Sequence, residues 1–357
     1  MSHQESKFLR NAWYMLGWST DFPAEGMKAL TVLGQNLVVY RKSDGEVVAL
    51  EDLCCHRLVP LSIGRREQDD IRCMYHGLKF GPDGCCKEIP GQTRISSAIR
   101  VRNFPVAELH GAAWVWMGVP ERADIALIPP IIGPDNPDWA LRSAVLEIDC
   151  NAALFWENLL DLSHAPYVHE TTFGASDAKT VELMTKGEIS METHVLDNGI
   201  ERISWHVGRQ SNPYFGIWPS DDLAINKFLV PGVFILITTS FSPGVKQRGA
   251  DAWLSEEPIL KRTTSQVITP VDDNRCKLFF NFGPWSKAGE HADKFFDVGR
   301  AAFIEDKFFV EQQQKMMQSH PDRKVMDLSM DGVIKRFEGV MKRQLEADRR
   351  ISQVAAG

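Results

Sequence analysis

The first third of the chain alternates between apolar and polar positions over short runs. Leu30–Tyr40 is rich in β-branched and apolar residues, and Ser43–Gly45 after it is a hairpin signal that leads into a second such run. Gly81–Gly84 marks another turn, and Ala112–Met117 is a further apolar run. The pattern predicts short strands joined by tight turns over residues 28–118.

The rest of the chain changes its periodicity several times. A Pro-rich stretch, Ile128–Pro137, has the composition of a linker, and Asn151–His164 has a helical pattern. Alternation typical of strands returns over residues 180–283, whereas the tail Ala292–Arg350 is mostly helical with a break near Pro321. Because strands and helices come in separate runs, we expect an α+β fold rather than a parallel α/β sheet.

The length and charge of the chain limit its organisation and its partners. The 357 residues are too many for one ordinary core and suit two domains, which we place at residues 1–120 and 121–357. Apolar residues make up 44% and charged residues 24%, as is usual for a globular protein. The net charge of −7 argues against a basic face, so we expect no nucleic-acid partner.

Nothing in the sequence indicates a membrane protein. No stretch approaches the roughly 20 apolar residues that span a bilayer. Met1–Trp18 has neither a long apolar run nor a small-residue cleavage site, which argues against a signal peptide. We therefore expect a cytoplasmic protein without membrane attachment.

The cysteines point to metal chemistry rather than to disulfides. Their odd number and low density do not suit a disulfide scaffold. They are Cys54, Cys55, Cys73, Cys85, Cys86, Cys150 and Cys276. Cys54 is followed closely by His56, and Cys73 by His76, whereas Cys55, Cys85 and Cys86 are expected to be packing or surface thiols.

Cys54 and His56 form a C-x-H unit, and Cys73 and His76 form a C-x-x-H unit sixteen residues later. Two facing turns of this kind can give two sulfurs to one iron and two nitrogens to the other, which is the ligand set of a Rieske [2Fe–2S] centre. A structural zinc site also uses two cysteines and two histidines. Its usual C-x₂₋₄-C and H-x₃₋₅-H spacings are absent, so the Rieske interpretation is preferred.

A second group of polar residues follows the linker: Asn158, Asp161, His164 and His169. Asp161 and His164 are about 60° apart on an α-helix and can share a face, whereas His164 and His169 are about 140° apart on an ideal helix. Pro166 lies between the two histidines and disrupts the turn, which can bring His169 back toward His164.

Two histidines leave a non-haem Fe(II) site short of one carboxylate, since the expected set is two histidines and one acid with open positions for dioxygen. The amphipathic segment Phe303–Gln314 carries Glu305, Asp306 and Glu311. Spacing alone does not choose among these three acids.

Parts of the sequence are similar to a known family. Glu51–Arg57 with Cys73–Gly77 resembles the Rieske domain of ring-hydroxylating and demethylating oxygenases. Within that family the sequence is most similar to vanillate O-demethylase oxygenase and toluenesulfonate methyl-monooxygenase, and Glu88–Gln92 is especially similar to the latter. The resemblance extends from Asn11–Tyr14 to Asp327–Arg336 and so covers most of the chain.

The sequence departs from the commoner form of this domain at a few positions. Cys55 and Met74 replace prolines, Leu58 replaces a glycine and Leu78 replaces a tryptophan. None of these is a ligand position, so the departures bear on the tuning of the cluster rather than on its presence.

The resemblance implies an N-terminal all-β Rieske domain and a C-terminal helix-grip (START-like) catalytic domain. It also implies two cofactors, a [2Fe–2S] cluster and a mononuclear Fe²⁺. It selects Asp306 as the third iron ligand beside His164 and His169, which leaves Glu305 and Glu311 as an expected solvated helix face.

The resemblance further implies a ring-shaped homotrimer in which each cluster serves the iron of the next subunit. Asp161 would bridge the two centres by a hydrogen bond to His76 of the partner subunit, and Asn158 would lie near the iron. A carboxylate that orients a ligand imidazole is ordinary chemistry around a metal.

The implied function is that of a terminal oxygenase. It would use O₂ and electrons from a separate NAD(P)H-dependent flavin/iron–sulfur reductase, because the chain has no G-x-G-x-x-G after a strand. The expected reaction is monooxygenation of a substituted aromatic acid, by O-demethylation or methyl hydroxylation. Two alternatives remain open: a ring dioxygenase that forms cis-dihydrodiols, and a non-catalytic Rieske electron carrier.

The substrate pocket is the least determined part of the site. His206 and Trp285 are candidates on the predicted strands of the catalytic domain, and Phe215, Trp218 and Phe234 are further ones. Aromatic residues in such positions more often belong to the core.

Overall fold

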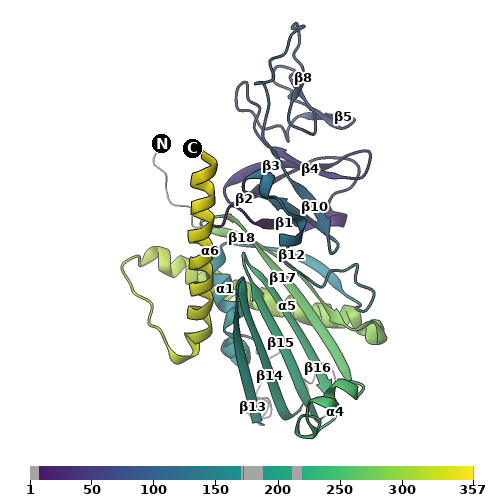
Figure 1. Cartoon of the computed structure of the whole chain (residues 1–357), viewed down its shortest axis with the longest axis vertical. Helices are drawn as coiled ribbons and strands as arrows, with labels where there is room; N and C mark the ends of the chain where they lie inside the picture. Colours follow the sequence, from purple (N-terminus) through teal and green to yellow (C-terminus); the bar gives the residue numbers. More distant parts are fainter. Residues whose placement is uncertain (1–7, 170–171, 173–187, 211–218, 357) are drawn as a thin grey trace. The chain divides into compact units, whose positions relative to one another are not determined.

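The computed structural model describes residues 8–169, 172, 188–210 and 219–356 (Figure 1). The chain divides into two compact units. One comprises the residues up to 128 with 269–273 and the end of the chain from 345, and the other comprises 129–268 and 274–344. No described helix is long and apolar enough to cross a membrane.

Two antiparallel sheets form the base of the first unit, in the strand orders β1-β11-β10 and β2-β3-β4-β9. The strands are β1 (Trp13–Trp18), β2 (Lys28–Val32), β3 (Gln35–Arg41), β4 (Val47–Glu51), β9 (Asn103–Phe104), β10 (Val106–Leu109) and β11 (Ala112–Trp116). Apolar side chains of both sheets share one core. The predicted turn at Ser43–Gly45 joins β3 to β4. The predicted run Leu30–Tyr40 is instead divided, because Leu33 and Gly34 turn with left-handed backbone.

A further sheet of short strands in the same unit, ordered β5-β6-β7-β8, supports the cysteine–histidine turns. Its strands are β5 (Arg65–Glu67), β6 (Asp70–Arg72), β7 (Lys79–Phe80) and β8 (Cys86–Glu88). The predicted turn Gly81–Gly84 connects β7 to β8. Ile71 and Phe80 are fully buried and pack in one cluster with Cys54 and Cys73, so the apolar core of this sheet positions both thiols.

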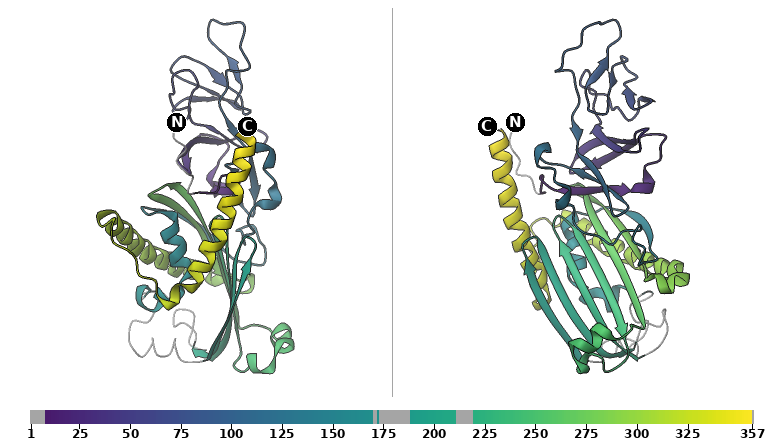
Figure 2. Two further views of the ribbon diagram at one scale, coloured as in Figure 1. Left: turned by 60° about the vertical axis from the view of Figure 1, so that its left-hand side comes forward. Right: turned by 45° about the vertical axis from the view of Figure 1, so that its right-hand side comes forward.

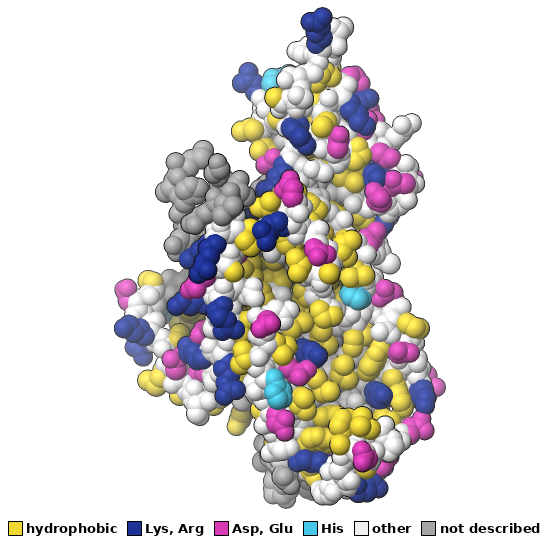
Figure 3. Space-filling model, in the orientation of Figure 1, with side chains coloured by type: hydrophobic (Ala, Val, Ile, Leu, Met, Phe, Trp, Pro, Cys, Tyr) yellow, Lys and Arg dark blue, Asp and Glu magenta, His cyan; other side chains and the backbone are white. Residues whose placement is uncertain are grey.

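The second unit is built on a long antiparallel sheet in the order β12-β18-β17-β16-β15-β14-β13. Its strands are β12 (Arg142–Ile148), β13 (Glu188–Leu196), β14 (Gly199–Gln210), β15 (Pro219–Leu229), β16 (Val233–Phe241), β17 (Leu260–Asp272) and β18 (Arg275–Pro284). Helices α1 (Ala152–Leu160) and α5 (Ala292–Ser319) lie on one face of this sheet (Figure 2). Hydrophobic side chains gather on the opposite face, where Leu223, Phe241 and Val245 form a cluster beside α4 (Ala250–Ser255) (Figure 3). The first unit is built mainly on antiparallel strands and the second combines a sheet with helices, so the α+β prediction is confirmed.

The remaining helices are short, apart from α6. They are η1 (Ser19–Asp21), η2 (Pro120–Arg122), η3 (Ile125–Leu127), η4 (Leu162–His164), α2 (Ala165–Val168), η5 (Lys246–Arg248), α4 (Ala250–Ser255), η6 (Ser286–His291), η7 (Ser329–Asp331) and α6 (Gly332–Ala356). The predicted interruption near Pro321 is the segment between α5 and α6.

Helix α5 packs on the sheet through one stripe of side chains. Phe295, Ala302 and Val310 recur at helical spacing on its buried side, and Asp306 lies in the same stripe. A Cβ at Gly299 would come within 2.9 Å of the Phe282 ring, so this glycine permits the close approach of α5 to β18. The packing therefore places a carboxylate where an apolar residue is expected.

Asp348, near the end of α6, holds the first described residues of the first unit. Its buried carboxylate accepts hydrogen bonds from the Arg10 and Asn11 backbone N–H groups at 2.8 Å and from Asn11 Nδ2 at 2.7 Å. We expect Asp348→Ala to lower the free energy of unfolding by about 2–3 kcal/mol, because it leaves these donors without their acceptor. Urea unfolding of the two proteins measures the difference, and a loss below about 0.5 kcal/mol would contradict the prediction.

Candidate metal centres

The two cysteine–histidine turns have matching backbone geometry. The Cys54 N–H donates to the Val59 carbonyl at 2.8 Å, and the Cys73 N–H donates to the Leu78 carbonyl at the same distance. Each turn thus closes on itself five residues after its cysteine. Two such loops can present their side chains to a shared ligand in equivalent ways.

The residue four positions after each cysteine has left-handed backbone. These residues are Leu58, with φ 59°, and Gly77, with φ 76°. A Cβ at Gly77 would also lie 2.7 Å from Pro90 Cγ, so only glycine fits there. Leu58 adopts the same conformation at a cost of about 1 kcal/mol.

The thiols and imidazoles of these turns lie in different environments. Cys54 and Cys73 are buried, whereas the rings of His56 and His76 are exposed and have their centroids 4.5 Å apart. Burial raises the pKa of the Cys54 thiol to about 11, and its hydrogen bond with Cys73 also raises it. Adjacent buried sulfurs with adjacent imidazoles outside them suit a cluster that takes thiolates on its inner iron and imidazoles on its outer iron.

The histidine segment of the second unit follows a different path from the predicted one. Helix α1 ends at Leu160, and Asp161 is both its C-cap and the N-cap of η4, so the predicted helix over Asn151–His164 is wrong in its last turn. Pro166 occupies the first turn of α2 rather than breaking a helix, because proline lacks the N–H that such a position leaves unbonded. The break at Asp161 is what reorients the chain before the first histidine.

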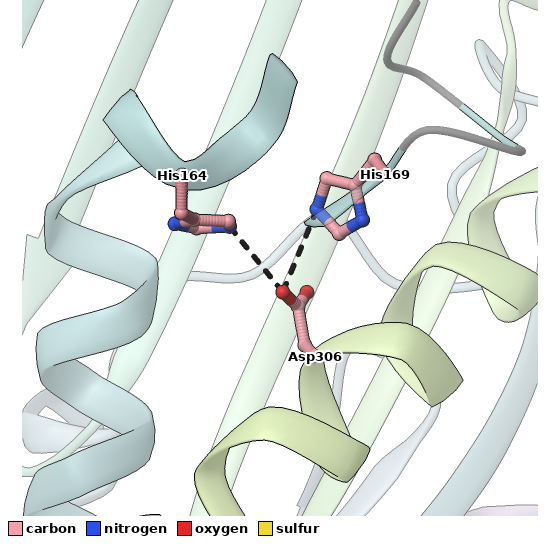
Figure 4. A group of neighbouring side chains, drawn as sticks. All are labelled: His164, His169 and Asp306. Atoms are coloured by element: carbon pink, nitrogen blue, oxygen red, sulfur yellow. Dashed lines mark ion pairs between the residues drawn. The ribbon is translucent and has the colours of Figure 1, made fainter. Parts of the chain in front are cut away.

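His164, His169 and Asp306 converge on one point (Figure 4). His164 Nε2 lies 3.3 Å and His169 Nε2 lies 3.5 Å from Asp306 Oδ1. One ligand atom from each residue lies within 4.8 Å of the other two, and the Asp306 side chain is only 3% exposed. Among the described residues, this is the cluster of histidines and acids that could hold a metal ion.

The far nitrogen of each ring is already bonded to an oxygen. His164 Nδ1 lies 2.6 Å from the Asp161 carbonyl, and His169 Nδ1 lies 3.0 Å from Glu305 Oε2. An Nδ1–H donor leaves the Nε2 lone pair directed at Asp306, which is the tautomer that a metal requires. Burial lowers the pKa of His164, but the hydrogen bond and charge of Asp306, together with the carbonyl and charge of Asp161, raise it by more, so the net shift of this pKa is upward.

Asn158 lies beside the same carboxylate. Its Nδ2 donates to Asp306 Oδ1 at 3.1 Å. Its Oδ1 is buried without a hydrogen-bond partner. The three converging ligand atoms and this unpaired buried oxygen fit a site for a cation.

Glu305 is the functional residue that the sequence did not identify. It was expected on a solvated helix face, but its Oε2 contacts His169 Nδ1 and accepts a hydrogen bond from Thr172 Oγ1 at 2.7 Å. Glu311 also departs from that expectation, since its carboxylate accepts the Asp149 N–H at 2.9 Å. Two adjacent acids on α5, Glu305 and Asp306, thus lie at one candidate metal site, Asp306 with an oxygen among the possible ligand atoms and Glu305 in contact with the His169 imidazole.

Replacing Glu305 by alanine should weaken iron retention or activity by about 10–100-fold, because His169 loses the acceptor that orients its ring. Glu305→Gln keeps an acceptor and should recover part of the loss. Chelator competition on the purified protein measures iron affinity. Glu311→Gln is the matched control on the same helix, and equal behaviour of Glu305→Ala and this control would contradict the role.

The structure gives the positions of the other residues predicted for the site, but these positions do not indicate a common function for them. The Asp161 carboxylate accepts hydrogen bonds from Ser163 N and Oγ at 2.9 and 3.0 Å. His206 lies on β14, and Trp285 packs beside the Lys261 and Lys287 ammonium groups. The further aromatic candidates are Phe234, which is buried on β16, and Phe215 and Trp218, which lie outside the described residues.

Family models match both parts of the chain. Residues 12–105 match the Rieske [2Fe–2S] domain, and residues 148–347 match the C-terminal domain of vanillate O-demethylase oxygenase. The second match alone covers more than half of the chain.

Two curated proteins are similar to this chain over nearly its full length and over nearly their own. The iron–sulfur subunit of the toluene-4-sulfonate monooxygenase system of Comamonas testosteroni is 30% identical over 96% of this chain and 98% of its own. The vanillate O-demethylase oxygenase subunit of a Pseudomonas species is 31% identical over 98% of both chains.

The fold is shared with a solved relative. The crystal structure of dicamba monooxygenase bound to dicamba superposes with a TM-score of 0.81, at 25% identity, over 96% of this chain and 99% of that one. The resemblance inferred from the motifs is thereby confirmed. The chain belongs to the Rieske non-haem iron oxygenases, as the oxygenase component of a monooxygenase system that has a [2Fe–2S] cluster and iron as its cofactors and a separate reductase as its electron source.

Proposed function

We propose that Cys54, His56, Cys73 and His76 hold the [2Fe–2S] cluster and that His164, His169 and Asp306 hold the iron. The cluster ligands would belong to a domain over residues 1–120, and the iron ligands to a domain over residues 121–357. One observation carries the iron assignment: three ligand atoms lie within 4.8 Å, and each ring has its other nitrogen bonded to oxygen.

The proposed reaction is monooxygenation of a substituted aromatic acid. One O₂, two electrons and two protons convert an aryl methoxy group to a phenol, formaldehyde and water, or an aryl methyl group to an alcohol and water. The iron, when bound, supplies the activation of dioxygen that this reaction requires. The electrons come from NAD(P)H through the reductase.

The side chains of the site hold it in position before any substrate arrives. Glu305 and the Asp161 carbonyl fix the two rings, and Asp306 supplies the negative charge that stabilises a cation between them. His169 and Asp306 are buried, so this charge acts at low dielectric and with little competition from water. Asn158 orients the Asp306 carboxylate from one side.

Arg202 on β14 supports the proposal that the substrate is an anion. Its Nη2 donates to the Leu160 carbonyl at 3.2 Å, at the end of the helix that leads to the histidines. Burial lowers the pKa of its guanidinium. Among the described side chains, no carboxylate forms an ion pair with it. The charge of Asp161 acts on this guanidinium without forming an ion pair with it, and a partly buried cation in this position suits the carboxylate of an aromatic acid.

The proposal includes a homotrimer in which Asp161 accepts a hydrogen bond from His76 of the partner subunit. The exposure of His56 and His76 supports an outward-facing electron exit. The Asp161 carboxylate, held by Ser163, is a fixed acceptor. The cytoplasmic location remains a prediction.

The test is a product analysis with the holoenzyme, a surrogate reductase, NADH and a panel of methoxylated and methylated aromatic acids. Formaldehyde in step with NADH consumption would support demethylation, and a benzylic alcohol would support hydroxylation. A cis-dihydrodiol would replace the proposal by ring dioxygenation. Oxidation of NADH without any oxygenated product would support the electron-carrier alternative.

A further inference from the structure

Two adjacent acids on β15 are both buried, but only one of them has a carboxylate that is hydrogen-bonded to described residues. Asp221 and Asp222 are 0% and 4% exposed. The Asp221 carboxylate accepts backbone N–H groups from Gly208, Gly244 and Lys246 at 3.0, 2.9 and 3.3 Å. The Asp222 carboxylate has no hydrogen bond or ion pair with any described residue, and its Oδ1 is fully buried. A buried carboxylate without a hydrogen-bond partner destabilises the folded protein, so its presence at this position calls for an explanation.

Asp222 lies on the face of the sheet that the helices cover. Side chains alternate along a strand, so Asp222, Asn226 and Phe228 share a face. Phe228 contacts the Phe337 ring of α6 with centroids 4.5 Å apart, and Phe337 also contacts Trp156 of α1. This is the face toward α1, which precedes the two histidines in the chain, and α5, which carries Asp306 (Figure 2).

A second unpaired polar group lies farther along the same face. Asn226 is 8% exposed, and its Oδ1 is buried without a partner. Its cross-strand neighbour on β14 is Arg202. Asn226 and Asp222 are about 13 Å apart along the strand, at about 3.3 Å per residue. Ala224 lies between them, so the strand presents two unsatisfied polar ends with a small side chain in the middle.

The hydrogen-bonding groups along this face limit what can bind there. Asp222 Oδ1 is an acceptor without a donor among the described residues, whereas the amide of Asn226 can present either its oxygen or its nitrogen. A ligand group that satisfies Asp222 Oδ1 is therefore a hydrogen-bond donor. A carboxylate suits the other end, beside Asn226 and the Arg202 cation.

We propose that Asp222 is a specificity-determining residue that binds a hydroxyl or amino group on the ring of the substrate, opposite to a carboxylate held by Arg202 and Asn226. The substrate class is then a hydroxy- or amino-substituted aromatic acid. This inference rests on the proposed oxygenase function and narrows its substrate. A site built around a buried acceptor rejects an analogue that lacks the donor, because the acceptor then remains unpaired.

Isothermal titration of the holoenzyme, together with kcat/KM, tests the inference on matched benzoates that carry a hydroxyl, an amino group or hydrogen on the ring. The wild-type protein should prefer the two donor-bearing acids by about tenfold or more. Asp222→Leu should abolish this preference by weakening only the donor-bearing acids. Asp222→Asn keeps an acceptor and should retain part of it. The hydroxy and amino compounds identify which donor is recognised.

Asp221→Asn is the matched control. It should lower the melting temperature, because backbone donors lose a charged acceptor, and leave the ratio of the affinities unchanged. An unchanged ratio in both Asp222 variants, or a wild-type protein indifferent to the donor, would overturn the inference.

The proposed oxygenase function can fail independently of the inference about Asp222. In that case no aromatic acid is oxygenated, while titration of a phenol without a carboxylate still reports on Asp222. If acids are oxygenated regardless of the donor, only the substrate inference fails.

Discussion

Asp306→Asn is expected to abolish oxygenase activity while the visible spectrum of the cluster remains. Iron content should fall from about three to about two per chain, since only the mononuclear site is lost. Asparagine has nearly the same shape but no charge, so two neutral imidazoles would be left to hold a dication. Activity with a surrogate reductase should fall by more than about 100-fold, beyond what is typical for residues that only orient a ligand.

The geometry makes this result specific to Asp306. Both Nε2 atoms approach its Oδ1, and the residue is buried in the stripe of α5 that packs on the sheet. The matched control is Asp293→Asn on the same helix, where an 81% exposed carboxylate pairs with Arg142 at the surface. Retention of about three irons by Asp306→Asn would show that another acid completes the site.

Cys54→Ser should have the complementary effect, which is loss of the cluster while the mononuclear iron remains. The cluster absorbance and its EPR signal should disappear, and iron should fall to about one per chain. A serine hydroxyl does not replace a thiolate in this ligand set, and activity should become undetectable because electrons no longer reach the iron. The first unit should also lose stability, because Cys54 packs in the core with Ile71 and Phe80.

The neighbouring cysteine provides the control. Cys55 is exposed, whereas Cys54 is buried and hydrogen-bonded to Cys73. Cys55→Ser should therefore keep the spectrum and at least half of the activity. If Cys55→Ser bleached the protein and Cys54→Ser did not, the assignment of the cluster ligands would have to shift by one residue.

The cluster motif could be predicted from the sequence because its ligands are close along the chain. A cysteine and a histidine on one short turn stay together in any fold that preserves the turn, and the repeat of the unit indicates a shared site. The turns at Ser43–Gly45 and Gly81–Gly84 were predictable for the same reason, since glycine allows the required left-handed backbone.

Only part of the iron site could be predicted from residues that are close along the chain. His164 and His169 are local, yet their orientation depends on a chain break at Asp161 that the helical pattern did not reveal. The helix α5 could be expected from its periodicity, but three of its acids satisfied the chemical requirement equally well. The rotation of α5 on the sheet decides that Asp306 points inward and that Glu305 reaches His169.

The sequence by itself thus determined the kinds of ligand, the cofactors and the α+β class. The tertiary structure decided which carboxylate meets the two imidazoles, which acid holds an imidazole from behind, and which of two adjacent aspartates on β15 lies without a partner. The physical reason is the range of the interactions. Turn geometry and ligand spacing depend on residues a few positions apart, whereas a side chain's partner across a helix–sheet interface depends on packing between segments more than a hundred residues apart.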